Sequence, residues 1–459
     1  MVEQVSQEVL ELINTDYKKA KEIFALNTAQ PSLAEALLVI YIAIPFYFLY
    51  QLVFDLFIKL NIPLCGSDWK SVTNLFLLDF SMIICVNIAA ETCMESHYWI
   101  LGACVILCLL IGEYLRRHPI SQTQREMAGQ SPYFQPISLN DKQKSYFTMF
   151  RGITMGLTVL AICAVDFPIF PRRLAKTLNW GCSLMDMGVG IFVINSGMVS
   201  RQLRYKGGMK AVKAALSSVS PLLILGFLRL FFVYEFGYQH VVTEYGVHWN
   251  FFFTLGLVAI FSAICATFLR NRLIVWISII TILSSYQYWL LHGGTEYLLN
   301  DNRTTLFDMN KEGILSCFGY FSIYLAGLLL GNEFNKERTR PEWKLAFWVS
   351  DHIQVSSRRM GNAAYVLLTV ACGGTYAGLA LLVNILVENL YIPIFYQAIN
   401  YNQLFIFLLA NVCTGLINYL FKTIIVPTWQ AYLILICYMV FITLVAYIMY
   451  YKKIKVKFW

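Results

Sequence analysis

The sequence predicts an all-α protein that crosses a membrane twelve or thirteen times. Of its 459 residues, 58% are hydrophobic and only 14% are charged, which is too few charges to cover the surface of a soluble protein. Apolar runs of about 20 residues, the length of a helix that spans hydrocarbon, recur from one end of the chain to the other. The connecting segments are short, so residues 1–459 are expected to form a single integral membrane domain.

Twelve membrane-spanning helices follow from these apolar runs. In chain order they are 33–54, 72–90, 97–115, 147–165, 182–200, 218–236, 249–269, 273–292, 313–331, 362–386, 402–421 and 430–450. Two weaker stretches, 341–355 and 388–400, could be re-entrant or interfacial segments. A truncated crossing between the ninth and tenth spans would bring the number to thirteen.

Residues 1–32, ahead of the first span, are polar and contain no continuous apolar core of the kind found in signal peptides. Leu10, Ile13, Tyr17 and Ile23 have the spacing of a short amphipathic helix, which is expected to lie on the membrane surface. Membrane insertion would then begin with the first span.

The formal net charge of +8 does not indicate nucleic acid, because the basic residues are divided among short loops. In the loops through the ninth span, the side of the N-terminus carries eight Lys and Arg residues, and the opposite side carries twenty. Cytosolic loops are enriched in Lys and Arg, so we expect the N-terminus on the lumenal side. Asn302, in the sequon Asn302-Arg303-Thr304, falls on that side and is a candidate glycosylation site.

Lys455 and Lys457 stand five and three places from the end of the chain. This is the pattern of a dilysine address for the endoplasmic reticulum, which is read from the cytosol. Positive charge beside the last span is an equally good explanation. If the pattern is an address, the C-terminus is cytosolic, the two ends lie on opposite sides, and the number of crossings is odd.

The twelve cysteines lie mostly inside apolar spans, where cysteine behaves as a small hydrophobic residue. No Cys-x-x-Cys pair and no Cys/His cluster with zinc spacing occurs. We therefore expect no structural metal, no disulfide framework and no permanently bound cofactor.

A stiff polar turn at 166–176 follows the fourth span. Two prolines fix two φ angles and remove two N–H donors, so the turn cannot be helix interior. Asp166 begins the turn and Lys176 ends it. At the edge of a membrane, a carboxylate can act as a general base and an ammonium can stabilise an oxyanion. The alternative is an interfacial salt bridge flanked by membrane-anchoring Arg172 and Arg173.

A second polar segment, 243–253, leads into the seventh span. His248, beside Trp249 and Asn250 and three phenylalanines, could carry a proton near a lipid head group. Anchoring by aromatic residues at the membrane boundary, with one satisfied histidine, is the alternative.

Charged residues within or beginning apolar spans form a third set of candidates: Arg151, Asp186 and Arg229. Such charges cost several kcal/mol unless they are paired or hydrated, so they are expected to face a cavity or one another. Asp186 and Arg229 could pair. Structural pairing and binding of a substrate head group both remain open. Small residues that allow close helix packing lie on the fifth span: Gly188, Gly190 and Gly197.

Two consecutive runs, 164–176 and 181–190, resemble the signature of the glucosaminyl-phosphatidylinositol inositol acyltransferases. Further blocks resemble this family in the same order: 146–152, 226–233, 242–253, 312–320 and 408–418. Ser357-Arg358-Arg359 is similar to its serine-arginine-arginine motif. The resemblance covers nearly the whole chain. One departure is that 332–356 is short and charged where family members usually carry a full span.

The resemblance implies an enzyme of the endoplasmic-reticulum membrane with about thirteen spans, which acts in the synthesis of glycosylphosphatidylinositol anchors. Its substrates would be acyl-CoA, usually palmitoyl-CoA, and glucosaminyl-phosphatidylinositol, whose inositol ring receives the acyl group. The family's acid and lysine fall on Asp166 and Lys176. Residues expected to bind substrate are Arg151, Arg172, Arg173, Asp186, Arg229, His248, Trp249, Asn250, Arg358 and Arg359.

A membrane transporter or lipid scramblase would also use buried charge, and a non-catalytic subunit of a membrane complex is a third possibility. Transporters commonly contain two related halves with broken helices in corresponding places. The sequence shows no such symmetry, so we favour the enzyme.

Overall fold

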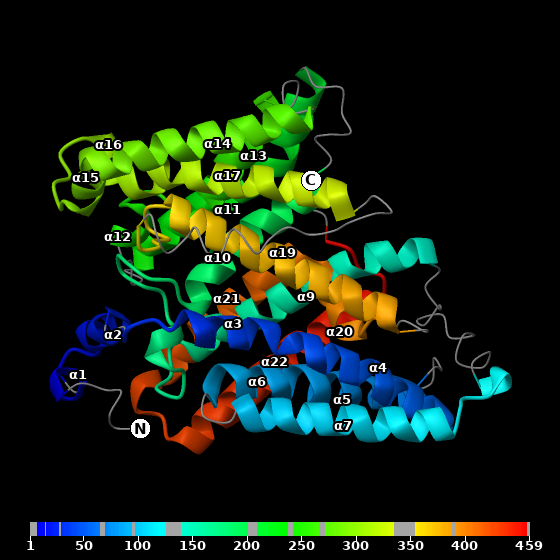
Figure 1. Cartoon of the computed structure of the whole chain (residues 1–459). Helices are drawn as coiled ribbons and strands as arrows, with labels where there is room; N and C mark the ends of the chain where they lie inside the picture. The colour runs from blue at the N-terminus through cyan, green and yellow to red at the C-terminus, as the bar shows by residue number, and fades with distance from the viewer. Residues whose placement is uncertain are drawn as a thin grey trace. The chain divides into compact units, whose positions relative to one another are not determined.

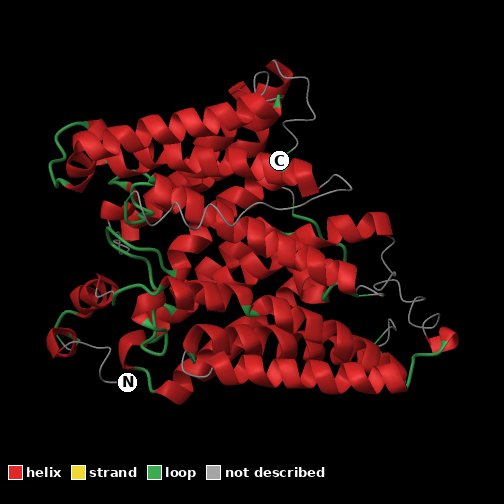
Figure 2. Cartoon of the chain, in the orientation of Figure 1, coloured by secondary structure: helices red, strands yellow, loops and turns green. Residues whose placement is uncertain are grey.

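The structure, a computed structural model, describes residues 7–13, 15–26, 29–64, 69–93, 97–124, 139–200, 209–236, 242–265, 271–334, 354–387 and 391–456. Within these ranges every extended regular element is helical and no strand occurs (Figure 2). The prediction of an all-α fold is confirmed.

Nine helical segments of the described chain are long and apolar enough to cross a membrane. They are Leu33–Lys59 (α3, Leu33–Tyr41, and α4, Ala43–Lys59), Lys70–Thr92 (α5, Trp69–Asp79, a π-helical turn, Phe80–Ile84, and α6, Cys85–Thr92), α7 (His97–Arg117), α9 (Leu139–Ala164), Arg272–Leu299 (α14, Arg272–Trp289, a π-helical turn, Leu290–Gly294, and α15, Thr295–Leu299), α17 (Lys311–Phe334), α19 (Ala363–Leu386), α21 (Gln403–Leu420) and α22 (Thr428–Tyr451). All nine coincide with predicted spans, which confirms a multi-pass membrane protein.

The other three predicted spans are shorter apolar helices: α10 (Leu184–Val199), α13 (Phe251–Ile264) and the part of α11 (Met209–Phe236) that covers residues 215–231. The weak stretch at 341–355 lies almost wholly outside the described residues. The other weak stretch contains α20 (Ile394–Tyr401), whose 8 residues span only about 12 Å at about 1.5 Å per residue. That length is too short for a crossing.

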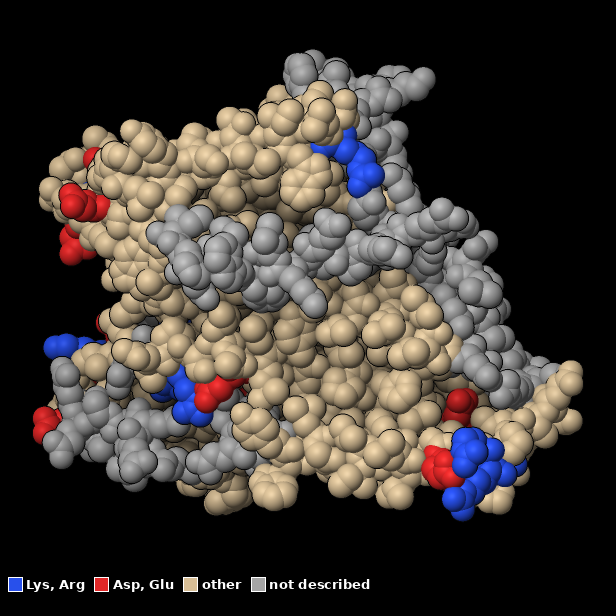
Figure 3. Space-filling model, viewed as in Figure 1, with Lys and Arg blue, Asp and Glu red and all other residues tan. Residues whose placement is uncertain are grey.

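Exposed apolar side chains agree with a surface that faces hydrocarbon. Figure 3 shows one face on which the described residues are mostly uncharged, with Lys, Arg, Asp and Glu confined to a few places. Along α7, large apolar side chains such as Trp99, Leu109 and Leu110 are exposed. A helix with this composition is favourably placed against lipid.

The helices group into two units. Unit 1 contains residues 34–174 and 376–456, and unit 2 contains residues 6–33 and 175–375. The boundary between Leu174 and Ala175 falls inside the polar turn at 166–176. Each unit is described separately below.

In unit 1, α9 and α21 pack against each other and run in the same direction. Arg151, midway along α9, donates a hydrogen bond to Gln403 at the beginning of α21. Near their ends, the Asn418 side-chain N–H donates to Asp166 Oδ2 at 2.7 Å. These two contacts therefore lie at the two ends of α21.

The beginning and the end of unit 1 lie near opposite ends of α21. Glu35, in the first turn of α3, forms an ion pair with Arg173, which follows α9. The C-terminal segment is held beside the beginning of α21, where the Val456 N–H donates to Asn402 Oδ1 at 2.9 Å. This arrangement is expected when the chain crosses the membrane an odd number of times.

In unit 2, helices α11, α13, α14 and α17 are neighbours, and α10 packs along α17 (Figure 1). Glycines bring α10 and α17 together: a Cβ on Gly197 would lie 2.3 Å from a carbonyl oxygen of α17, and one on Gly327 would lie 2.4 Å from a carbonyl oxygen of α10. Gly190 packs against Thr369, whereas Gly188 has no such neighbour. Close helix packing at the fifth span is therefore present at two of its three predicted glycines.

The polar N-terminal segment forms two short helices, α1 (Gln7–Leu12) and α2 (Tyr17–Leu26). Their buried side chains are Val9, Ile13, Ala20 and Phe24. Of the predicted apolar face, the Leu10 side chain is outside the described part of the structure, Ile13 is buried, and Tyr17 and Ile23 are partly covered. The helices are present, and their position on the membrane surface stays a prediction.

Candidate active site

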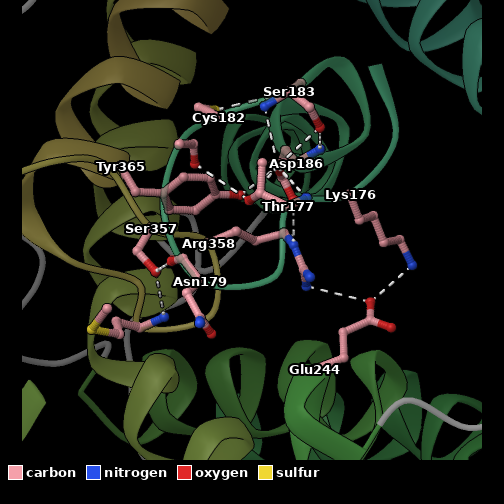
Figure 4. A network of polar contacts seen from close by, with 12 residues as sticks. Lys176, Thr177, Asn179, Cys182, Ser183, Asp186, Glu244, Ser357, Arg358 and Tyr365 are labelled. Atoms are coloured by element: carbon pink, nitrogen blue, oxygen red, sulfur yellow. Dashed lines mark hydrogen bonds and ion pairs between the residues drawn. The ribbon is translucent and has the colours of Figure 1, made fainter. Parts of the chain in front are cut away.

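Asp186 is the buried centre of a polar network in unit 2 (Figure 4). Ser183 caps α10, and Asp186, three residues later, completes a capping box with it. Asp186 Oδ2 also accepts from the Thr177 hydroxyl at 2.8 Å. The carboxylate is fully buried, so local helix-capping chemistry places a negative charge inside the protein.

Arg358 binds this buried carboxylate. Its Nε lies 2.7 Å from Asp186 Oδ1, and the Arg358 side chain is only 3% exposed. The guanidinium also lies over the Tyr245 ring, 5.6 Å from its centroid. Burial alone would lower the pKa of Arg358, but Glu244, Tyr245 and Asp186 outweigh it and raise the pKa well above its usual value.

Glu244, on the short helix α12 (Val242–Tyr245), joins this buried pair to Lys176. Its Oε1 lies 3.3 Å from Arg358 Nη1 and 2.8 Å from Lys176 Nζ. Burial would raise the pKa of Glu244, but the charges of Lys176 and Arg358 lower it to about 2. The Glu244 carboxylate is therefore ionised at neutral pH.

Exposure increases along this series of ion pairs. The Asp186 side chain is fully buried, that of Glu244 is 16% exposed and that of Lys176 is 41% exposed. Lys176 thus presents an ammonium at the accessible end of a buried ionic scaffold. Such a group can donate hydrogen bonds to an oxygen that becomes negatively charged during a reaction.

The serine-arginine-arginine motif lies against the segment that follows Lys176. The Gly181 N–H donates to the Ser356 carbonyl oxygen at 2.8 Å, and the Ser357 hydroxyl donates to the Asn179 carbonyl oxygen. Gly181 has a φ of +101°, a backbone conformation that glycine adopts without strain. The motif and the residue before it therefore hold the 177–186 segment in place through hydrogen bonds.

Arg359, the next residue of the motif, joins a second buried cluster. It donates to Asn179 at 2.6 Å and to Glu312 at 3.0 Å. Glu312, in the first turn of α17, also pairs with Arg303 at 2.6 Å. Asn179 thus connects this cluster to the first network.

The motif lies at the end of unit 2 where α17 begins, because Arg359 pairs with Glu312 in the first turn of that helix. Arg358 and Lys176 share Glu244 as a partner. Arg358 and Arg359 therefore lie at the same end of unit 2 as Lys176.

Arg229 does not pair with Asp186, whose charge partner is Arg358. Arg229 is half-buried and its positive charge instead helps to lower the pKa of Glu244. The suggested Asp186–Arg229 pair is therefore wrong, although both residues belong to the surroundings of one network.

The aromatic segment ahead of α13 is held by its own hydrogen bonds. Asn250 is the N-cap of α13, and its amide donates to the Gly226 carbonyl oxygen at 3.0 Å. Trp249 Nε1 donates to Thr254 at 2.9 Å, and the His248 backbone N–H donates to Asn310 at 2.8 Å. This geometry gives Trp249 and Asn250 a structural task, and their part in substrate binding stays a prediction.

The remaining predicted residues belong to unit 1. Asp166 accepts a hydrogen bond from Asn418, and Arg173 pairs with Glu35. Arg172 donates to the Val165 carbonyl oxygen at 2.9 Å. Burial lowers the pKa of Arg172 to about 10, although the Asp166 charge acts in the opposite direction. Asp166 and Lys176, the predicted catalytic pair, therefore belong to different units, and each has a partner in its own unit.

Sequence reasoning missed Glu244, Asn179, Glu312 and Asn418 as polar partners at these sites. Apart from Arg303, nine residues from Glu312, the partners that join them to these sites are 47 to 252 residues away, so no local pattern indicates them. The capping box of Ser183 and Asp186 was also not predicted, although the three-residue spacing of a serine and an acid is its sequence signal. Among the described residues, no three His, Cys, Asp or Glu side chains gather as a metal site would require.

Comparison with known proteins identifies the family. The GWT1 family model matches residues 17–449. The phosphatidylinositol-glycan biosynthesis class W protein of Dictyostelium discoideum is 34% identical over 444 residues, which cover 84% of this chain and 88% of that protein. GPI-anchored wall transfer protein 1 of Saccharomyces cerevisiae is 34% identical over residues that cover 83% of this chain and 89% of that protein. Human glucosaminyl-phosphatidylinositol-acyltransferase PIGW is 31% identical, covering 86% and 90%. The chain therefore belongs to the GWT1 family.

Proposed function

We propose that this protein transfers a fatty acyl group, usually palmitoyl, from acyl-CoA to the inositol ring of glucosaminyl-phosphatidylinositol in the endoplasmic-reticulum membrane. The names of the relatives support a role in the biosynthesis of glycosylphosphatidylinositol anchors and an acyltransferase activity on this glycolipid. The observation that carries the proposal is the accessible Lys176 ammonium at the end of the Asp186–Arg358–Glu244 network.

In the proposed reaction, Asp166 accepts the proton of an inositol hydroxyl as its oxygen attacks the thioester carbon. The tetrahedral intermediate carries a negative oxygen, which the Lys176 ammonium stabilises. Collapse of the intermediate forms the ester bond and breaks the carbon–sulfur bond. The coenzyme A thiolate leaves and receives the proton from Asp166, so no further reactant is needed.

Arg172 and Arg173 are proposed to neutralise substrate phosphates, because guanidinium groups bind phosphate oxygens well. His248 is proposed to shape the acyl-CoA site or to relay the proton in place of Asp166. Arg151 and Arg229, each half-buried, are proposed as further contacts for anionic parts of the substrates. Arg358 and Arg359 are almost fully buried, which favours support of the site over direct contact.

The decisive experiment replaces Asp166 with Asn in purified protein that is supplied with palmitoyl-CoA and glucosaminyl-phosphatidylinositol. Asparagine keeps the shape but cannot accept the proton, so we expect the rate of acyl transfer to fall by about 100-fold or more. Glu113→Gln is the matched control, because it removes an exposed carboxylate that pairs with two arginines on α7. A near-normal rate for Asp166→Asn, with product formed by the wild type, would exclude Asp166 as the base.

A further inference from the structure

We infer that Glu244 is a positioning residue that holds the Lys176 ammonium in place for acyl transfer, and that it does so from the buried Arg358–Asp186 ion pair. This inference rests on the function proposed above. It assigns a role to Glu244, which is not one of the two proposed catalytic residues.

The geometry places Glu244 between a fixed group and a mobile one. A single carboxylate oxygen, Oε1, contacts both Lys176 Nζ at 2.8 Å and Arg358 Nη1 at 3.3 Å. The lysine side chain has four rotatable carbon–carbon bonds and loses rotamer entropy when it is fixed. Arg358, by contrast, is held by Asp186 and by the Tyr245 ring. Glu244 therefore links the half-exposed Lys176 ammonium to the buried Arg358 guanidinium, whose position is fixed.

The buried Arg358–Asp186 ion pair is itself held in place by several hydrogen bonds. Asp186 accepts hydrogen bonds from the backbone and hydroxyl groups of Thr177 and Ser183, and the Tyr365 hydroxyl donates to the Asp186 carbonyl oxygen at 2.8 Å. A charge pair with this many partners resists displacement. The position of Lys176 is therefore determined by residues from α10, α12 and the motif ahead of α19.

Charge supports the same role. Glu244 faces three cations, namely Lys176, Arg358 and Arg229, which together keep its carboxylate ionised. Because the carboxylate remains negative across the pH range in which an enzyme of this kind works, it supplies a constant counter-charge. A neutral side chain at this position would leave the three cations to repel one another.

We expect Glu244→Gln to reduce kcat, measured per folded enzyme, by about 10- to 100-fold, as for other residues that orient a catalytic group. The KM for acyl-CoA should stay within about 2-fold, because the substrate itself is not contacted. Glu244→Asp, which keeps the charge on a shorter side chain, should recover part of kcat. Equal loss in both variants, or a change confined to KM, would overturn the positioning role. Glu113→Gln again serves as the control.

A double variant tests whether Glu244 acts through Lys176. If it does, Lys176→Ala combined with Glu244→Gln should be no slower than Lys176→Ala alone, because the group being positioned is already absent. Multiplication of the two single effects would show that Glu244 acts independently of Lys176 and would contradict the inference.

A chemical measurement separates this inference from the proposed function. Acetic anhydride acetylates accessible amines, and mass spectrometry reports the rate at Lys176. Loss of the ion pair should raise that rate several-fold in Glu244→Gln, while lysines elsewhere react as in the wild type. If the wild type forms no acylated glycolipid, the proposed function fails, yet the labelling still tests the tether. An unchanged labelling rate at Lys176 would disprove the tether whatever the activity.

Discussion

At the scale of single residues, the polar core of unit 2 shows how a charged group is made tolerable inside a membrane protein. Asp186 has five hydrogen-bonding contacts from Thr177, Ser183 and Arg358. Removing one partner of such a buried pair leaves an uncompensated charge, which costs about 3–5 kcal/mol. Asp186 and Arg358 are therefore tolerated only as a pair, and this pair joins segments that lie far apart in the chain.

The lowered pKa of Glu244 predicts how the stability of the folded protein depends on pH. Its pKa is lowered from the ordinary value of 4.5 to about 2 in the folded protein, so the unfolded chain binds the proton first. The stabilisation, on the order of 3 kcal/mol, is complete above about pH 4.5 and is lost as the pH falls toward 2. Thermal unfolding in detergent should show wild type more stable than Glu244→Gln at pH 7, with the difference shrinking below pH 4.5. A difference independent of pH would contradict this explanation.

At the scale of helices, the spans were predictable because hydrophobicity is a local property of the sequence. Partners were not. Asp79, in the second span, is fully buried and accepts hydrogen bonds from the Tyr50 hydroxyl at 2.8 Å and from the Phe395 N–H at 2.7 Å. Phe395 lies more than 300 residues away, so only the folded chain brings these groups together. The same reason kept Glu244 and Asn418 out of the predicted site.

The glycines of α10 provide a matched pair for testing helix packing. Gly197 lies against α17, where a Cβ would come within 2.3 Å of a carbonyl oxygen, whereas a Cβ on Gly188 would meet no atom within 4 Å. We therefore expect Gly197→Ala to push the helices apart and to destabilise the protein by about 1–3 kcal/mol. Gly188→Ala should be neutral or should stabilise by up to about 1 kcal/mol. Melting temperatures in one detergent compare the two, and equal effects would show that close packing does not matter there.

At the scale of the whole molecule, contacts between distant segments show which segments lie at the same end of a unit, and a count of loop charges does not. Counting Lys and Arg predicts an N-terminus opposite the more basic side, but the count leaves the position of Arg358 and Arg359 open. Their contacts place them with Lys176 in unit 2. In unit 1, Glu35 and Val456 lie near opposite ends of α21. This separation agrees with chain ends on opposite sides of a membrane. A lumenal N-terminus and a cytosolic C-terminus stay predictions.

The side of each end can be tested with Asn302 as the internal reference. Asn302 is exposed in the loop ahead of α17, and its sequon is expected to face the lumen. In sealed microsomes, endoglycosidase treatment after solubilisation should increase the gel mobility of the wild type but not that of Asn302→Gln. Protease added outside the vesicles should remove a C-terminal tag, because the C-terminal segment lies at the opposite end of unit 1 from Glu35. A glycan on Asn302 combined with a protected tag would show that both face the lumen and would rule out the odd number of crossings.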